Sequence, residues 1–344
     1  MCELGQRDEC FPKLHSESSG HAGLRRDERR NVPLDSCHQH KMDEIQIQLP
    51  PSWVNASRFE EVLRLGQSPH QDPCSAIRFQ FPKGCQLMTD AIVRLLSICN
   101  QLACCLKRVI LDFQDGDSGV GGYLNRIGFF DCLAAQVEVL PRRPVTWASK
   151  IYKGQNRGLV EIERIDRTNR DQSVLNRLSD AISGACAARK DVKDLTDSAW
   201  MIFAELIDNV FSHSETPLDG FAALQVYKGG NCLKVTVSDS GLGMLETLRP
   251  ALAADAPQLA KLPDIELLVE VFRQGLSRHG GSRGCGLKGC ADKAIKFKAE
   301  LDVRLPTVRV LLVPGKDGYS ANTAYCYSGL PLMWGTHVCF TIGT

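Results

Sequence analysis

The chain has 344 residues, which is long enough for two ordinary domains. Hydrophobic residues make up 43% of it and charged residues 24%, a balance typical of a soluble globular protein rather than a disordered or membrane protein. Because it contains 41 Lys and Arg and 40 Asp and Glu, its net charge of +1 gives no global reason to expect a nucleic acid or an anionic membrane as partner.

Several kinds of targeting and metal-binding segment are not expected. The most apolar stretch, 95–106, contains Ser, Asn and Gln and is well short of the roughly 20 apolar residues that a membrane-spanning helix needs. Residues 1–30 carry charge throughout and lack the apolar core of a signal peptide. The 15 cysteines form no C-x-x-C pair, so no zinc ribbon or thioredoxin motif is expected. The sequence therefore predicts a protein of the reducing cytoplasm.

The N-terminal part of the chain divides into a leader and a small domain. Residues 1–44 mix both charge signs with Gly, Ser and His and show no sustained apolar period, which predicts a disordered leader. The ranges 76–81, 89–106 and 108–113 then have the patterns of a strand, a helix and a strand. Residues 45–150 are therefore expected to form a small α/β domain.

The strand expected at 109–113 is followed by Asp117-Ser118-Gly119 and by an apolar run over 123–133. This arrangement loosely resembles the STAS domains that partner anti-sigma kinases, and the resemblance would make Ser118 a candidate phosphorylation site. A strand, an acidic glycine-containing loop and a helix also occur together in many other α/β folds. An unassigned small α/β domain therefore remains the alternative.

A domain boundary is expected where Pro141 and Pro144 are followed by a polar stretch that extends to Arg157. The second domain is expected over 158–344, with a first strand at 158–165 and a helix at 171–188. The sequence contains no internal repeat and no coiled-coil heptad, so no long dimerisation stalk is predicted. Whether the chain forms a homodimer stays open.

A helix expected over 196–214, with Thr196 as its cap, carries the first candidate site residues. At 100° per residue its apolar residues form one stripe: Ala199, Ile202, Phe203, Leu206 and Val210. Glu205 and Asn209 lie at one margin of this stripe, roughly 6 Å apart. An amide oxygen can ligate Mg²⁺, and a nearby carboxylate can orient or deprotonate a nucleophile. An ordinary amphipathic helix, with polar residues at the margins of its apolar stripe, is the simpler explanation of the same residues.

The second candidate motif is D-x-G-x-G, formed by Asp239, Gly241 and Gly243. It directly follows an alternating strand over 232–238, so the carboxylate is expected at a strand end, where the glycines let the backbone come close to a ligand. A carboxylate held there can accept a hydrogen bond from an exocyclic amine such as that of adenine. An ordinary turn explains the motif equally well when it is taken alone.

The third candidate motif is a glycine-rich loop over 280–289, followed by a helix expected at 290–298. Glycines before a helix leave backbone N–H groups able to point at phosphate oxygens. The loop is not a Walker A motif, because Gly-Lys-Ser/Thr is absent, and no clear strand precedes it as in a Rossmann fold. A flexible loop without a ligand is the alternative.

Taken together, E-x-x-x-N, D-x-G-x-G and G-x-x-G-x-G-L resemble the N, G1 and G2 boxes of the GHKL superfamily in order and spacing. That superfamily includes histidine kinases, anti-sigma serine kinases, DNA gyrase, MutL and heat-shock chaperone ATPases. The stretch 334–342 also resembles the family's closing strand. The resemblance covers roughly 158–344 and implies an α+β architecture, the two-layer Bergerat sandwich that binds ATP and Mg²⁺.

At the adenine end, the resemblance implies that Asp239 recognises the adenine amino group and that Thr336 assists it. Gly241 and Gly243 would form one hinge of an ATP lid that spans 244–283.

At the phosphate end, the resemblance implies that Asn209 ligates Mg²⁺ and that Glu205 is the general base in a member that hydrolyses ATP or phosphorylates a hydroxyl. Gly284 and Gly286 would meet the phosphates, and Leu287 belongs to the same nucleotide-binding set.

Three functions remain open on the sequence. The first is a nucleotide-gated regulatory switch that hydrolyses ATP slowly and acts on a protein partner. It is favoured because the ATP motifs are present without the phospho-acceptor hairpin of histidine kinases. The second is a serine/threonine kinase of the anti-sigma type, and the third is a non-catalytic ATP-binding scaffold. The sequence does not choose among them, because the reaction depends on what is presented to the γ-phosphate.

Overall fold

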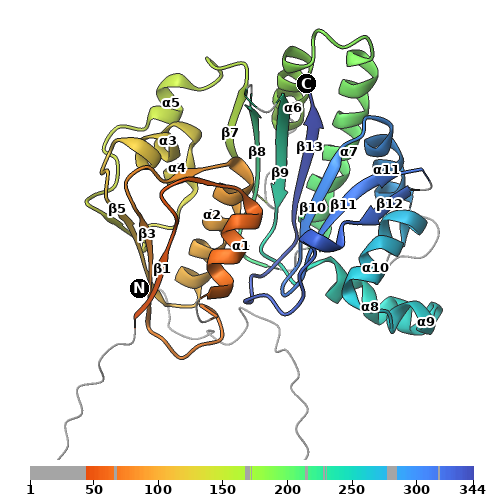
Figure 1. Ribbon diagram of the computed structural model, residues 1–344, viewed down its shortest axis with the longest axis horizontal. Helices are drawn as coiled ribbons and strands as arrows, with labels where there is room; N and C mark the ends of the chain where they lie inside the picture. The colour runs from red at the N-terminus through yellow and green to blue at the C-terminus, as the bar shows by residue number, and fades with distance from the viewer. Residues whose placement is uncertain are drawn as a thin grey trace, which may run out of the picture.

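A computed structural model describes residues 44–65, 68–166, 171, 173–213, 216–227, 229, 231–276, 285–316 and 318–344. It has a mixed α/β fold with one parallel sheet, one antiparallel sheet and a short two-stranded ribbon (Figure 1). The leader expected at 1–44 lies, apart from Glu44, outside the described residues. In the described ranges, no helix is long and apolar enough to cross a membrane.

The parallel sheet has the strand order β1-β3-β5-β6. Its strands are β1 (Glu44–Gln48), β3 (Ala76–Phe81), β5 (Arg108–Phe113) and β6 (Glu138–Leu140). The helices that connect or flank them are α1 (Ala56–Leu65), α2 (Thr89–Cys104), α3 (Gly119–Ile127), α4 (Phe129–Cys132) and α5 (Ala148–Tyr152). A ribbon of β2 (Trp53–Val54) and β4 (Gln86–Leu87) lies beside them. The strand, helix and strand predicted between residues 76 and 113 are confirmed.

One face of the parallel sheet packs on the helices, and the other carries polar side chains. In β1 the residues alternate between buried Ile45 and Ile47 and more exposed polar neighbours. On the polar face Arg78 Nε lies 2.7 Å from Glu44 Oε1. This alternation is typical of a sheet with one covered face.

The antiparallel sheet has the order β12-β11-β10-β13-β9-β8-β7, and every neighbouring pair is antiparallel. Its strands are β7 (Leu159–Ile165), β8 (Gly220–Tyr227), β9 (Cys232–Ser238), β10 (Glu300–Arg304), β11 (Arg309–Gly315), β12 (Gly318–Ala321) and β13 (His337–Gly343). The last strand of the chain, β13, therefore lies in the middle of the sheet, between β9 and β10.

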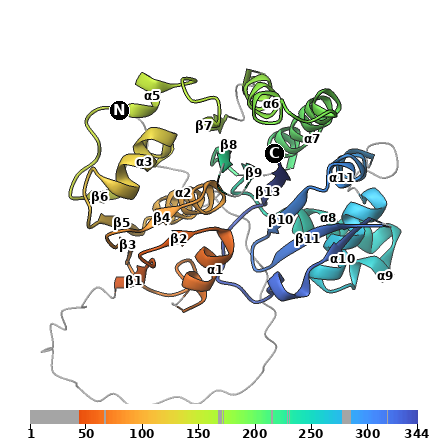
Figure 2. The same cartoon turned by 45° about the horizontal axis from the view of Figure 1, so that its top comes forward.

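Helices cover one face of this sheet (Figures 1 and 2). They are α6 (Ser173–Ala185), α7 (Val192–His213) and α11 (Cys285–Lys296), together with α8 (Met244–Asp255), α9 (Pro257–Ala260), α10 (Asp264–Glu270) and the π-helix η2 (Val271–Gly275). A short 3₁₀ helix, η3 (Thr323–Tyr325), follows β12.

The prediction that Thr196 caps α7 is wrong. The helix begins one turn earlier, at Val192, and Thr196 Oγ1 donates a hydrogen bond to Val192 O at 2.8 Å inside the helix. Leu195 is fully buried, so the additional turn extends the apolar contact of α7 with the core. Burial of Leu195 has outweighed the local preference of threonine for a cap.

The opposite face of the antiparallel sheet is covered by the N-terminal helices. Figure 2 shows α1 and α2 between the two sheets. In β9, Leu233, Val235 and Val237 belong to the core on the α7 side, whereas Lys234 and Ser238 make polar contacts with α2. Strand alternation thus assigns odd-numbered residues of β9 to one face and even-numbered residues to the other.

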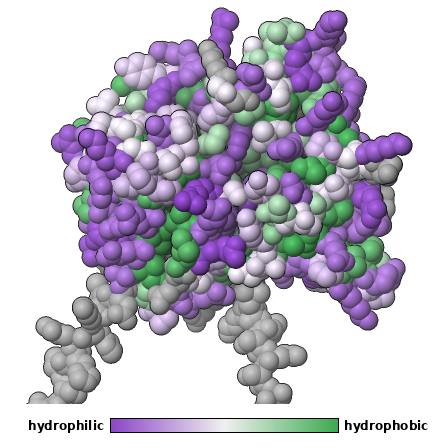
Figure 3. All heavy atoms as spheres, in the orientation of Figure 1, coloured by the Kyte–Doolittle hydropathy of each residue, from purple (hydrophilic) through white to green (hydrophobic). Residues whose placement is uncertain are grey.

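The two expected domains, 45–150 and 158–344, share a core. The apolar cluster around the N-terminal helices also contains residues of β7, β8 and the segment before β13: Leu159, Ile162, Phe221, Ala223 and Met333. Hydrophilic side chains predominate on the face drawn in Figure 3, with apolar residues between them.

The segment predicted as an ATP lid, 244–283, is largely built into the fold. Leu267, Leu268, Val271 and Phe272 are buried in the same core as β11 and α11. The residues over 277–284 lie outside the described ranges. A lid that moves as a whole over 244–283 would have to expose these buried side chains, so the packed part, 264–275, belongs to the scaffold.

Candidate nucleotide site

The segments that contain Asp239 and Thr336 lie side by side at one end of the β9–β13 ladder. The ladder continues beyond the strands, because Asp239 N–H donates to Thr336 O at 3.0 Å. The Asp239 carboxylate accepts hydrogen bonds from Gly241 N–H (2.8 Å, Oδ1) and from Thr336 N–H (3.3 Å, Oδ2). These bonds hold the half-buried carboxylate at the strand end, on the face that α7 covers.

Glycine is required at two positions around this carboxylate. Gly335 has φ +98°, and a Cβ there would overlap the backbone carbonyl of Asp239. Gly243 has φ +92°, and a Cβ there would lie 2.6 Å from Pro306 Cδ. Thr336 Oγ1 accepts a hydrogen bond from Met244 N–H at 3.0 Å, which ties the start of α8 to the same corner. Gly335 was not among the predicted site residues, although its place before Thr336 was a usable signal.

The candidate phosphate end is formed by α7 and the first turn of α11. A Cβ added at Gly286 would collide with the carboxylate of Glu205, so the α11 backbone lies directly against this side chain. Burial, and secondarily the charge of Asp208, raises the pKa of Glu205. A carboxylate with a raised pKa is a better proton acceptor than an ordinary one.

Asn209 lies one turn beyond Glu205 on α7 and is half-buried. Its Nδ2 is buried and has no hydrogen-bond partner among the described residues. A buried donor without a partner is costly, and only an acceptor such as a phosphate oxygen would satisfy Nδ2, whereas a cation would be held by Oδ1.

One contact places the two ends near each other. A Cβ added at Gly220 would lie 2.6 Å from Val210 Cγ1 and 2.8 Å from Ser238 O. Val210 follows Asn209 and Ser238 precedes Asp239, so the last turns of α7 lie beside the end of β9. The structure thus brings the E-x-x-x-N and D-x-G-x-G motifs to one corner of the molecule.

The remaining predicted residues are placed only in part. Leu287 is partly buried and packs against the core of α7. Gly284 lies outside the described residues. Ser118 directly precedes α3, beside the parallel sheet, and its hydroxyl donates to Asp115 O at 2.6 Å. It is not part of this corner.

The donor set for a magnesium ion is small. Among the described residues, no group of three or more His, Cys, Asp or Glu side chains is placed to hold a metal ion. Mg²⁺ in nucleotide sites usually takes one or two protein oxygens and completes its shell with phosphate oxygens and water. Asn209 therefore fits a magnesium that arrives with a polyphosphate better than a tightly held resident ion.

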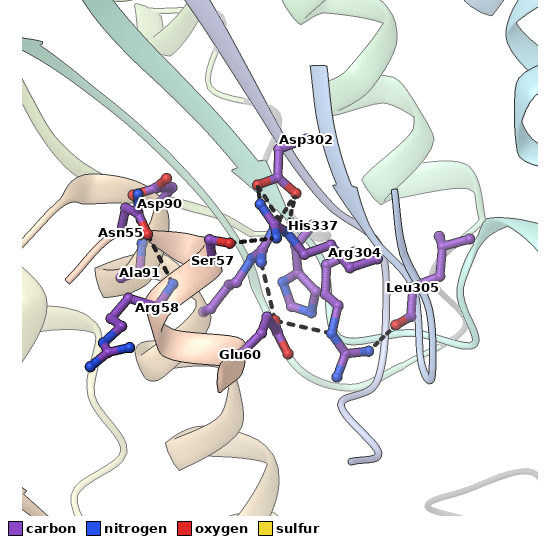
Figure 4. Close-up of polar contacts among 12 residues, drawn as sticks. Asn55, Ser57, Arg58, Glu60, Asp90, Ala91, Asp302, Arg304, Leu305 and His337 are labelled. Carbon is purple, nitrogen blue, oxygen red and sulfur yellow. Dashed lines mark hydrogen bonds and ion pairs between the residues drawn. The ribbon is translucent and has the colours of Figure 1, made fainter. Parts of the chain in front are cut away.

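A buried ion network lies behind this corner, between the N-terminal helices and the second sheet. Arg94 of α2 pairs with Glu60 (3.1 Å) and with Asp302 (2.9 Å). Glu60 also pairs with Arg304 (3.0 Å), and Asp302 with Arg309 (2.8 Å). Figure 4 shows the Arg304 guanidinium directed at Glu60 and Leu305, with Asp302 on the opposite side of the network and His337 beside Arg304. The sequence reasoning missed this network because its members are far apart in the chain and form no motif.

Two histidines next to the corner, the half-buried His70 and the fully buried His337, predict acid sensitivity. Burial, with a smaller contribution from Lys107, lowers the pKa of His70 to about 4, although its hydrogen bond to Gln101 acts in the opposite direction. Burial lowers the pKa of His337 well below its ordinary value. The unfolded chain therefore binds more protons than the folded one between about pH 6.5 and pH 4.

We expect the free energy of unfolding to fall as the pH is lowered through this window, by up to about 3 kcal/mol for His70. Urea unfolding between pH 7 and pH 4.5 measures it. His70→Gln should make the pH dependence shallower, and an equally steep loss in this variant would contradict the assignment.

Comparison with known proteins does not assign a function to this corner. The sequence matches no protein-family model, and no curated protein is significantly similar to it.

Proposed function

We propose that this chain is a Mg²⁺-dependent ATP-binding protein of the GHKL superfamily, with a Bergerat-type fold over 158–344. We further propose that it acts as a nucleotide-gated regulatory switch that hydrolyses ATP slowly. The observation that carries the proposal is the meeting of α7, α11 and the β9–β13 end at one corner, although their motifs are far apart in the sequence.

The adenine end has the chemistry for an exocyclic amine. Asp239 is held by two backbone N–H groups, so its orientation is set before a ligand arrives. An ionised carboxylate accepts several hydrogen bonds, and one from the adenine amino group is the proposed contact. Guanine presents a carbonyl oxygen at the corresponding position, which a carboxylate would repel.

The phosphate end has the chemistry for slow hydrolysis. Glu205 would accept a proton from the attacking water, and its raised pKa suits that role. Asn209 would hold the magnesium ion, whose charge would offset that of the phosphates. The close approach of Gly286 to Glu205 would keep the carboxylate facing the start of α11.

The test is a product assay with γ-labelled ATP. We expect wild type to bind ATP in Mg²⁺, to bind it more weakly when Mg²⁺ is chelated, and to release labelled phosphate slowly. Glu205→Ala should lower the release rate at least about 100-fold, because general base catalysis typically contributes that much. Its ATP affinity should stay within about threefold of wild type, since Glu205 acts on water rather than on ATP.

Two glycines of α11 provide a matched pair of variants. Gly286→Ala should displace the Glu205 carboxylate and lower hydrolysis at least about tenfold, because misplaced catalytic groups lose much of their effect. Gly289→Ala should change nothing, since no atom lies within 4 Å of a Cβ there.

The outcomes separate the three functions. Transfer of the label to Ser118 or to a partner protein would show that the chain is a protein kinase and not a slow-hydrolysis switch. Binding without turnover, unchanged by Glu205→Ala, would leave a scaffold. Absence of ATP binding by wild type would refute the proposal as a whole.

A further inference from the structure

Gln101 is a fully buried residue of α2 whose amide is completely used in hydrogen bonds. Its Nε2 donates to Ser240 Oγ and to Trp334 O, both at 2.9 Å. Its Oε1 accepts from Trp334 N–H at 3.0 Å and lies 3.1 Å from His70 Nε2. Two donors and two acceptor positions are all that a glutamine side chain offers.

Two of the three partners of Gln101, Ser240 and Trp334, belong to the two segments that form the proposed adenine end. Ser240 directly follows Asp239, and Trp334 precedes Gly335 and Thr336. The amide of Gln101 therefore joins the D-x-G-x-G turn to the Gly-Thr segment from behind the sheet.

A second set of contacts runs parallel to the first. Ser97, one turn earlier on α2, lies with its Oγ 3.0 Å from Ser238 Oγ. Ser238 Oγ lies 2.5 Å from His337 Nδ1, and His337 Nε2 lies 3.0 Å from Trp334 O. Both residues that flank Asp239 in the chain are thus bonded to α2.

We infer that Gln101 is a positioning residue of the nucleotide site. Through it the N-terminal part of the fold, residues 45–150, sets the affinity for ATP and the preference for adenine. The inference rests on the proposed function. Because coupling between two sites is reciprocal, bound ATP must in turn stabilise the contact between α2 and the 334–336 segment.

The key variant is Gln101→Leu, which removes the amide and keeps a buried side chain of similar length. It leaves both backbone groups of Trp334 and the hydroxyl of Ser240 without these partners. The direct hydrogen bonds between Asp239 and Thr336 remain. Ser240 and Trp334, on either side of them, lose their joint anchor on α2, so the adenine contact is less closely positioned.

The neighbouring Asn100 supplies a matched control. Its amide also clamps a backbone segment, donating to Cys132 O (3.0 Å) and accepting from Ala134 N–H (2.8 Å). That segment lies in the N-terminal layer, away from the adenine end. Asn100→Leu therefore tests the loss of an equivalent clamp on the same helix.

Equilibrium binding of ATP and GTP to the full chain is measured below the unfolding temperature of each variant. We expect Gln101→Leu to weaken ATP binding about tenfold and to lower the ratio of ATP to GTP affinity by a similar factor. Asn100→Leu should leave this ratio unchanged, because a global loss of stability weakens both nucleotides alike.

If the ratio of ATP to GTP affinity is the same in wild type, Gln101→Leu and Asn100→Leu, the inference is overturned while the proposed function stands. Absence of ATP binding by wild type would overturn both.

Should Gln101→Leu not fold, hydrogen exchange of the wild type, measured with and without ATP, decides. ATP is expected to slow exchange in 97–104 and at Trp334. Protection of 239–244 alone would overturn the coupling.

Discussion

Asp239→Asn should weaken ATP binding about 100-fold, which corresponds to losing about 3 kcal/mol from a hydrogen bond to a charged group. The substitution preserves the size of the side chain but replaces one acceptor oxygen with a donor. That NH₂ group would face the N–H of Gly241 or the N–H of Thr336, and it could not accept from the adenine amino group; all three of these groups are donors themselves. Isothermal titration with ATP in the presence of Mg²⁺ measures the change.

The control for this substitution is Asp255→Asn, at the exposed end of α8. It makes the same change in charge and should leave ATP affinity within about twofold, because solvent-exposed charges contribute little at a distance. If wild type binds ATP and Asp239→Asn binds it equally well, the carboxylate does not recognise adenine. The position of the base would then have to be sought elsewhere.

Asp302→Ala should destabilise the folded chain by about 3–5 kcal/mol, the range found when one partner is removed from a buried ion pair. Asp302 accepts hydrogen bonds from Arg94 and, through both carboxylate oxygens, from Arg309. Burial alone would raise the pKa of Asp302, yet Arg94 and Arg309 hold it far below its usual range. Without the carboxylate, two buried guanidinium groups lose their main counter-charge.

Chemical denaturation of the full chain measures this loss. Asp117→Ala is the matched control, because Asp117 pairs with Arg142 at 3.1 Å where both side chains are more than half exposed. An exposed pair of this kind contributes about 0–1 kcal/mol. A loss below about 1 kcal/mol for Asp302→Ala would show that the network is solvated and does not secure the contact between the layers.

The buried network also explains why the two halves form one unit. Arg94 and Glu60 come from the N-terminal helices, whereas Asp302 and Arg304 come from β10. Separating the halves would leave these charges without partners, and a purely apolar contact would not impose one register between them. We therefore expect α2 to keep a fixed position behind the adenine end, as the role inferred for Gln101 requires.

The sequence by itself determined the local elements and the candidate site residues. Alternation over 232–238 predicted a strand, and the apolar stripe around Phe203 predicted a helix; both are present. These predictions succeed because strand and helix periods are properties of neighbouring residues. The helix start at Val192, rather than at Thr196, depended on how deeply Leu195 is buried, which no local pattern reports.

Only the tertiary structure decided what covers the second face of the antiparallel sheet. Lys234, Ser238 and Asp302 are polar residues of strands, and they bond side chains of α2 rather than water. Arg94 and Asp302 are 208 positions apart, and Ser97 and Ser238 are 141 apart. A polar residue in a strand pattern shows that it avoids the apolar core, but not whether water or a distant charged side chain satisfies it. The role inferred for Gln101 depends on that distinction, and so it follows from the fold and not from the motif.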